Sequence, residues 1–358
     1  SAIFLDVDDL EDISALELYV AQSQLIMMFL SRGYFASRNC LREIRASLAQ
    51  RKPFLLVHET DPNKGGLTLA EACLECPAEA RETIFSLPNG MPRPVIDWHR
   101  IYDFQMCSLK MIAVGVIQYV PQYAKRSLRA DKVAGALSAP AERPGDVANQ
   151  VVDASENIQS AEELAVYMPG EVTLEHLSFK VPVRIYASPN NPGAFETASE
   201  LSEVFGEDQL AVEPLMDDTI DDILSKHAAE SRNSGKQNAR QSFALRSKSR
   251  AARAKSGDRL DFLILYLNQK TFLGPEGEAF AEEVRQLCSL IPIVMLHEND
   301  PARDGCEFSN FFQTTPADLI DDGLYNTLAL AMYIGEHRRV SLKLAAMAFG
   351  AKKQGRNF

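Results

Sequence analysis

An internal repeat constrains this chain of 358 residues more than any other feature of its sequence. The stretch "PFLLVHETDPNKGG" (53–66) matches "PIVMLHENDPARDG" (292–305), with the Pro, His-Glu, Asp-Pro and Gly residues in register. Further pairs keep the same order along the chain: "REIR" (42–45) with "EEVR" (282–285), and "SLKMIA" (108–113) with "SLKLAA" (341–346). Because a repeat of this length marks one structural unit used twice, the sequence predicts a duplicated domain.

Each copy alternates short apolar runs with amphipathic stretches. In the first copy, "LIMMFL" (25–30) and "PFLLVHE" (53–59) predict strands, and "NCLREIRASLAQ" (39–50) has the apolar spacing of a helix. Strands that are apolar on both faces and separated by helices indicate a parallel sheet covered on both sides. We therefore predict an α/β fold, with two tandem flavodoxin-like, doubly wound parallel-sheet domains.

The composition suggests where these domains begin and end. We predict a first domain at 1–123, a linker at 124–161 rich in Ala, Pro, Asp and Asn, a second domain at 162–350, and a tail at 351–358. The second copy opens with a strand, "VPVRIYAS", and a helix, "FETASELSEVF", that have no match in the first. A flavodoxin-like sheet without its first strand has a gap at its centre. We therefore expect the first domain to be truncated at its N-terminus, or to receive that strand from elsewhere.

A basic segment at 231–259 interrupts the second copy. It carries nine Lys and Arg residues and almost no large apolar side chain, so we expect a disordered, solvated insert. Its charge also makes weak binding to anionic lipid or RNA an alternative. The whole chain has a formal net charge of −12, which argues against general nucleic-acid binding.

Neither a metal site nor a membrane span is predicted. No apolar run reaches the roughly 18–20 residues that a bilayer requires, and six scattered cysteines suit reduced thiols in the cytoplasm. Cys73 and Cys76 form a single CxxC without a second pair, which is a weak metal signal. The repeated pairs His58-Glu59 and His297-Glu298 are expected to hydrogen-bond the Asp-Pro turn that follows each of them.

Several motifs of the first copy resemble the Toll/interleukin-1 receptor (TIR) domain. The stretch "SQLIMMFLSRGYFASRNCLREI" (23–44) is similar to the third strand and helix of that family, with its S-x-x-Y and C-x-x-E elements. The box "RKPFLLVHETDP" (51–62) resembles the strand that follows, and "VIDWHRIYDFQ" (95–105) the last strand and helix. "LDVDDLEDI" (5–13) falls where the second strand leads into the family's BB loop. The resemblance covers most of 2–118 and, more weakly, 181–350.

The resemblance implies two functions for this chain. TIR domains assemble with other TIR domains in signalling, and some hydrolyse the nicotinamide–ribose bond of NAD with a glutamate in the C-x-x-E position, here Glu43. A fixed carboxylate stabilises the oxocarbenium-like sugar that forms when this bond breaks, and NAD is then a substrate, with no cofactor needed. Glu283 aligns with Glu43 as a second candidate, although the second copy lacks the preceding cysteine. The substrate-binding candidates are Asp6, Asp8, Asp9, Ser31, Cys40 and Trp98.

Three alternatives remain open from the sequence. Glu43 is also explained as a carboxylate in the first turn of a helix capped by Ser37 or Asn39, where the helix dipole favours it. In that case the protein is a non-enzymatic adaptor or scaffold. A remote alternative is a haloacid-dehalogenase-like phosphatase, with Asp6 as nucleophile and Asp8 as acid. That class needs an acidic magnesium box, and "SGDRLD" (256–261) is the only near match.

Overall fold

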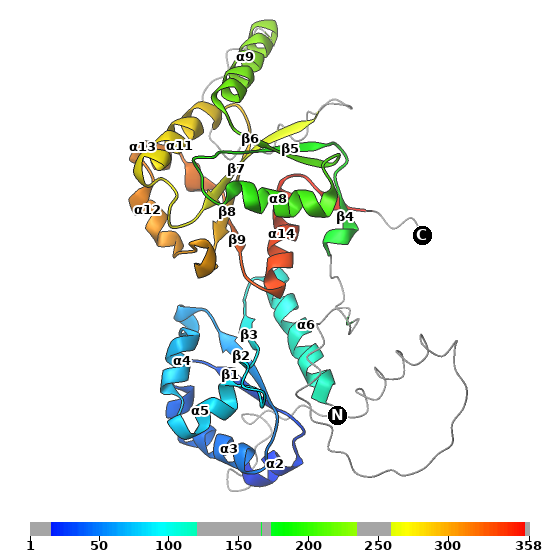
Figure 1. Ribbon diagram of the computed structural model, residues 1–358, viewed down its shortest axis with the longest axis vertical. Coiled ribbons are helices and arrows are strands. Elements are labelled where there is room, and N and C mark those ends of the chain that lie inside the picture. Colours follow the sequence, from blue (N-terminus) through cyan, green and yellow to red (C-terminus); the bar gives the residue numbers. More distant parts are fainter. Residues whose placement is uncertain (1–15, 120–165, 167–172, 235–258, 355–358) are drawn as a thin grey trace, which may run out of the picture. The chain divides into compact units, whose positions relative to one another are not determined.

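The structure is a computed structural model, and it describes residues 16–119, 166, 173–234 and 259–354. The chain divides into two compact units, Ser1–Glu171 and Val172–Phe358, each of which is considered by itself (Figure 1). The predicted linker, most of the basic insert and the segment with Asp6, Asp8 and Asp9 lie outside the described residues. No helix in the described ranges is long and apolar enough to cross a bilayer.

The second unit is built on a five-stranded, wholly parallel sheet. Its strands follow the order β6-β5-β7-β8-β9, which is the 2-1-3-4-5 order of a flavodoxin-like wound fold. The predicted α/β class with a parallel sheet is confirmed here. The strands are β5 (Val183–Ala187), β6 (Leu210–Pro214), β7 (Leu260–Leu267), β8 (Ile293–Glu298) and β9 (Leu330–Met332).

Helices cover both faces of this sheet, and the central strand β7 shows why its sequence is apolar throughout. Alternate β7 residues pack into two different cores. Phe262, Ile264 and Tyr266 pack into the first core, and Leu263, Leu265 and Leu267 pack into the second. The first core includes α8 (Ala194–Phe205) and α14 (Glu336–Ala348). The second includes α9 (Asp217–Ser234), α11 (Gly274–Leu287), α12 (Phe311–Thr314) and α13 (Ala317–Asp321).

The first unit has a smaller parallel sheet in the described residues, with the order β1-β2-β3. Its strands are β1 (Ile26–Leu30), β2 (Phe54–Glu59) and β3 (Val95–Trp98). Its helices are α2 (Leu16–Gln22), α3 (Arg38–Ala49), α4 (Leu69–Glu75), α5 (Ala78–Phe85) and α6 (Tyr102–Tyr119). The three strands that the sequence predicts within the described part of this unit are therefore confirmed.

Strand β1 differs from its counterpart β7 in its surroundings. Leu30 pairs with His58 as Leu267 pairs with His297, so the two strands are equivalent. The side chains of Met27 and Phe29 are 44% and 38% exposed, whereas the equivalent β7 residues are fully buried. In the second unit β5 and α8 cover this edge and face, and no described residue of the first unit takes their place. Among the described residues of this unit, β1 is therefore an edge strand with one partly exposed face.

Three segments depart from the expectations. The segment between β2 and β3, where no helix is predicted above, contains α4 and α5, and Thr68 and Glu71 form a capping box that starts α4 in a polar sequence. Helix α9 extends to Ser234, so the predicted insert begins as a helix. The predicted tail starts inside the fold, where β10 (Lys352–Lys353) pairs with β4 (Leu177–Ser178). Periodicity does not detect β4 and β10, because each strand is short and the two lie far apart along the chain.

Candidate functional site

The carboxyl edge of the first sheet brings several of the predicted site residues together. Ser31 follows β1 directly, Trp98 is the last residue of β3, and Cys40 lies in the first turn of α3. Because parallel strands end at one edge, these three side chains belong to the same side of the unit. Asp6, Asp8 and Asp9 lie outside the described residues, so their position relative to this edge stays a prediction.

Glu43 lies in the second turn of α3, not in the first. Ser37 caps the helix by accepting a hydrogen bond from the backbone N–H of Cys40 at 3.4 Å, which leaves no acidic residue in the first turn. The proposed explanation of Glu43 as a dipole-favoured helix-start residue is therefore wrong, because the dipole effect fades beyond one turn. Ile44, the next residue, is buried in the core, so Glu43 flanks the apolar stripe of the helix and is half-buried.

Trp98 packs at this edge against an aromatic neighbour. Its ring meets that of Phe29 edge-on, with the centroids 6.1 Å apart. Both side chains retain some exposure, so the pair presents a partly open apolar surface at the carboxyl end of β1 and β3. The backbone oxygen of Trp98 accepts a hydrogen bond from the Thr60 hydroxyl at 3.1 Å, which ties β3 to the loop after β2.

Glu283 occupies the equivalent place on α11 of the second unit, where its neighbours are described. The amide of Asn190, in the loop after β5, donates to the Glu283 carboxylate at 2.7 Å. The buried Ser188 hydroxyl also interacts with this carboxylate, and Asp217 at the start of α9 lies close enough to affect it. The loops after the first, second and third strands of the wound sheet thus meet at Glu283, which is the switch point of this strand order.

The surroundings of Glu283 favour its neutral form. Burial raises the pKa of this carboxyl above its ordinary value, and the negative charge of Asp217 acts in the same direction. Hydrogen bonds from Ser188 and Asn190 oppose the rise without cancelling it. A carboxyl group that retains its proton to higher pH is suited to proton transfer. It is less suited to stabilising a cation, which requires the charged form.

The repeated His-Glu-x-Asp-Pro motif is explained by the turn that it builds. The carboxylate of buried Glu298 accepts the backbone N–H of Asp300 at 2.9 Å, and that of Glu59 accepts the N–H of Asp61 at 3.0 Å. Each carboxylate also pairs with an arginine, Arg338 or Arg100. The prediction that these pairs hydrogen-bond the Asp-Pro turn is confirmed for the glutamate of each pair, whereas the two histidine side chains bond other partners.

The glycine that ends each motif is required by a close backbone approach. A Cβ on Gly66 would lie 2.6 Å from the backbone of Asp61, and one on Gly305 would lie 2.7 Å from the backbone of Asp300. Only glycine fits at such distances. The matching residues of the His-Glu-x-Asp-Pro motif therefore carry a structural requirement, and Glu43 and Glu283 lie outside that motif.

The pKa values of the two repeated histidines shift in opposite directions, and a different residue faces each ring. Burial disfavours protonation of His58, but the Asp97 carboxylate at 2.9 Å and the Leu67 carbonyl outweigh it and raise the pKa of His58. Ala331 faces His297 in the equivalent register position, and burial lowers the pKa of that histidine. His297 still binds the Cys306 carbonyl at 2.7 Å.

The described residues contain no group of three or more His, Cys, Asp or Glu side chains placed to hold a metal ion. Cys73 and Cys76 lie at the end of α4 without a disulfide, and burial raises the pKa of the Cys76 thiol to about 11. Asp261, the last residue of the "SGDRLD" stretch, forms an ion pair with Arg184 at the amino end of β7. This is the edge of the sheet opposite to Glu283.

Sequence reasoning found both glutamates but missed the residues around Glu283. The turn "NNPG" (190–193) after β5 carries no recognised motif, yet its Asn190 bonds Glu283 of α11, 93 residues further along the chain. Loops that follow parallel strands converge at the carboxyl edge, and this convergence was the available signal. It can be used only for strands that the sequence reveals. β6 was not among them. Comparison with protein-family models, with curated proteins and with solved structures found no match.

Proposed function

We propose that this protein is a cytoplasmic TIR-like signalling protein that assembles with other TIR-like units and hydrolyses the nicotinamide–ribose bond of NAD. The observation that supports this most is the equivalent placement of Glu43 and Glu283. Each precedes a buried residue, Ile44 or Val284, on the helix that follows equivalent strands of two wound sheets. In such sheets the carboxyl edge is where ligands bind.

Glu43 is the proposed catalytic carboxylate. Cleavage of the bond between ribose C1′ and the nicotinamide nitrogen leaves its electron pair on nicotinamide and positive charge on the sugar. A carboxylate near C1′ stabilises this charge, water then attacks C1′, and one proton is released with ADP-ribose and nicotinamide. The C-x-x-E spacing supports Glu43 for this role. Glu283 fits it less well, because Asn190 already holds one of its oxygens and its pKa is raised.

The first prediction concerns the reaction itself. We expect the full chain at high concentration to release nicotinamide from NAD, and Glu43→Gln to lower the rate by about 10²-fold, the usual cost of removing one electrostatic stabiliser. Glu283→Gln is the matched control on the equivalent helix, and we expect it to retain the rate within a few-fold. Nicotinamide release is measured by chromatography, and the folding of each variant by circular dichroism.

The outcomes separate the candidate functions. Loss of turnover only in Glu283→Gln would move the catalytic carboxylate to the second unit, and equal loss in both variants would mean that the units act together. No turnover by the folded wild type would leave a non-enzymatic scaffold. Assembly is measured in the same samples by light scattering. If turnover depends on assembly, its rate rises more steeply than the protein concentration.

A further inference from the structure

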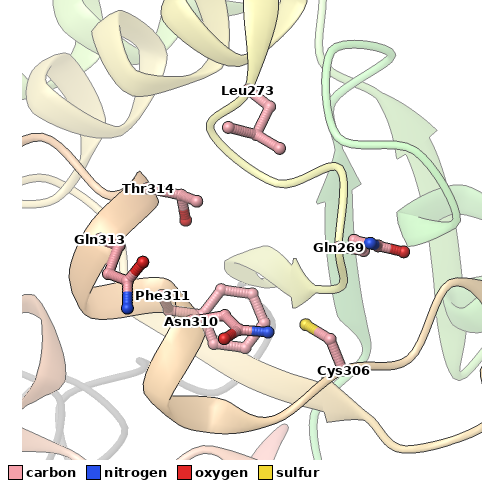
Figure 2. A pocket seen from close by; sticks show the side chains of 7 residues that line it. All are labelled: Gln269, Leu273, Cys306, Asn310, Phe311, Gln313 and Thr314. Atoms are coloured by element: carbon pink, nitrogen blue, oxygen red, sulfur yellow. The ribbon is translucent and has the colours of Figure 1, made fainter.

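A cavity of about 210 Å³ opens at the carboxyl edge of the second unit (Figure 2). One wall comes from the segment between β7 and α11, with Gln269 and Leu273, and the other from α12 and the residues before it. None of these residues belongs to the surroundings of Glu283. The cavity is therefore a separate candidate for binding, on the edge of the sheet where ligands of this architecture are found.

The lining is polar but uncharged. Three primary amides, those of Gln269, Asn310 and Gln313, line the cavity together with Phe311, whose side chain is buried. Primary amides both donate and accept hydrogen bonds, so they match a ligand group that does the same. Lys270 and Asp304 form an ion pair at 2.7 Å next to this segment, so no unpaired cation there calls for an anionic ligand.

One lining group is left unsatisfied. The Thr314 hydroxyl oxygen is buried and has no hydrogen-bond partner among the described residues, and Figure 2 shows it facing the space above Phe311. By contrast, the hydroxyl of Thr315 bonds to that of Tyr325 at 2.6 Å. A buried polar atom without a partner is uncommon in a native protein and points to a ligand or a water that completes it.

The size of the cavity limits what it holds. Pockets that enclose a whole drug-sized ligand measure roughly 300–1,000 Å³, so about 210 Å³ accommodates one ring with a substituent and not a dinucleotide. An aromatic ring suits the apolar part of the lining, which Leu273, Cys306 and the edge of Phe311 form, and a carboxamide on that ring matches the lining amides and the Thr314 hydroxyl. A carboxylate in the same place loses its hydration without meeting a cation, which is costly.

We propose that this cavity binds a neutral aromatic carboxamide, and specifically nicotinamide, the leaving group of the reaction proposed above. The identity of the ligand rests on that proposed function, whereas the preference for a neutral amide rests on the lining alone. The cavity then retains a product at a site separate from both glutamates. Binding there is independent of turnover and is measured without it.

The test is isothermal titration of the full-length protein with nicotinamide and with nicotinate, its isosteric anion. We expect nicotinamide to bind at least tenfold more tightly. Thr314→Val, which removes only the hydroxyl, and Gln313→Leu, an exposed position, should each weaken nicotinamide binding by about tenfold, the effect of one lost hydrogen bond of about 1.4 kcal/mol. Gln286→Leu, an exposed amide of α11 outside the cavity, is the matched control and should bind as the wild type does.

Equal affinity for the two ligands, no binding of nicotinamide, or wild-type binding by both cavity variants would overturn the proposal. Glu43→Gln and Glu283→Gln should bind nicotinamide normally, which keeps the two proposals apart. Nicotinamide binding without NAD turnover would support the proposed cavity ligand and contradict the hydrolase function. NAD turnover without nicotinamide binding at the cavity would support the hydrolase function and contradict the proposed cavity ligand.

Discussion

At the scale of single residues, the repeat keeps the histidine but not the direction of its pKa shift. His58 and His297 end equivalent strands and bind equivalent loop carbonyls, those of Leu67 and Cys306. Their difference comes from the neighbouring strand, where Asp97 faces one ring and Ala331 the other. The local sequence of each histidine is nearly identical, so the direction of its pKa shift depends on a residue far along the chain.

This difference gives a prediction for pH dependence. The raised pKa of His58 contributes stability that is fully present below the unfolded value of about 6.5 and is lost as the pH rises through the folded pKa. The lowered pKa of His297 acts oppositely: its contribution is present above about 6.5 and is lost as the pH falls through its folded pKa.

Titration of the imidazole resonances by NMR measures both groups. We expect Asp97→Asn to bring the pKa of His58 below its ordinary value, as burial alone does for His297, and to leave His297 unchanged as the internal control. If His58 retains a raised pKa in this variant, the Asp97 contact does not determine its charge.

At the scale of elements, a side chain completes the pairing of two strands. The β5–β7 ladder ends at Tyr186 and Leu263, and the buried amide of Asn191 then bonds both the N–H and the carbonyl of Tyr266 at 2.8 Å. Asn191 thus acts as one further residue of β5. The backbone turns away here through Gly193, whose φ of 84° and 2.5 Å approach to the Tyr266 ring exclude a Cβ.

Asn191→Ala is therefore expected to destabilise the second unit. The Tyr266 N–H loses its partner in a buried place, which costs about 1–3 kcal/mol, while its carbonyl keeps the Thr271 hydroxyl. Urea unfolding followed by fluorescence measures the change in the free energy of unfolding. Asn326→Ala, at an exposed asparagine, is the control and should change it by less than about 0.5 kcal/mol. A similar small change for Asn191→Ala would show that the ladder does not need the side chain.

At the scale of the whole molecule, the two units differ in how completely their sheets are covered. The second has apolar cores on both faces of five strands. In the described part of the first, α6 covers β2 and β3, but Met27 and Phe29 of β1 remain partly exposed on the same face. Burial of apolar area stabilises a fold by about 25 cal/mol for each Å². Apolar area that stays in water does not make this contribution.

We predict that residues 172–358 fold alone with one cooperative transition, because both cores of their sheet lie within them. Thermal unfolding by circular dichroism should give the midpoint of the more stable transition of the full chain. Residues 1–171, the control, should unfold at a lower temperature. Aggregation of the 172–358 fragment, or a midpoint shared by both fragments and the full chain, would contradict this.

Periodicity and the repeat identified most of the strands, because burial on both faces of a parallel sheet leaves an apolar run that is visible locally. The same reasoning missed β6, in which only Leu210 is fully buried, and α4, whose polar sequence begins as a helix at a capping box. Local patterns predict an element when its burial is strong. They fail where a hydrogen bond or a neighbouring strand supplies the stability instead.

The sequence by itself predicted an α/β fold with parallel sheets, and it predicted that Glu43 and Glu283 hold equivalent places in a repeated unit. Only the tertiary structure decided what surrounds them. Asn190 reaches Glu283 across 93 residues, and Thr314 meets the loop after β7 at a shared cavity. The reason is physical. The burial of a strand is visible in its own apolar composition, whereas a site is formed by loops, and which loops meet depends on the order of strands in the sheet.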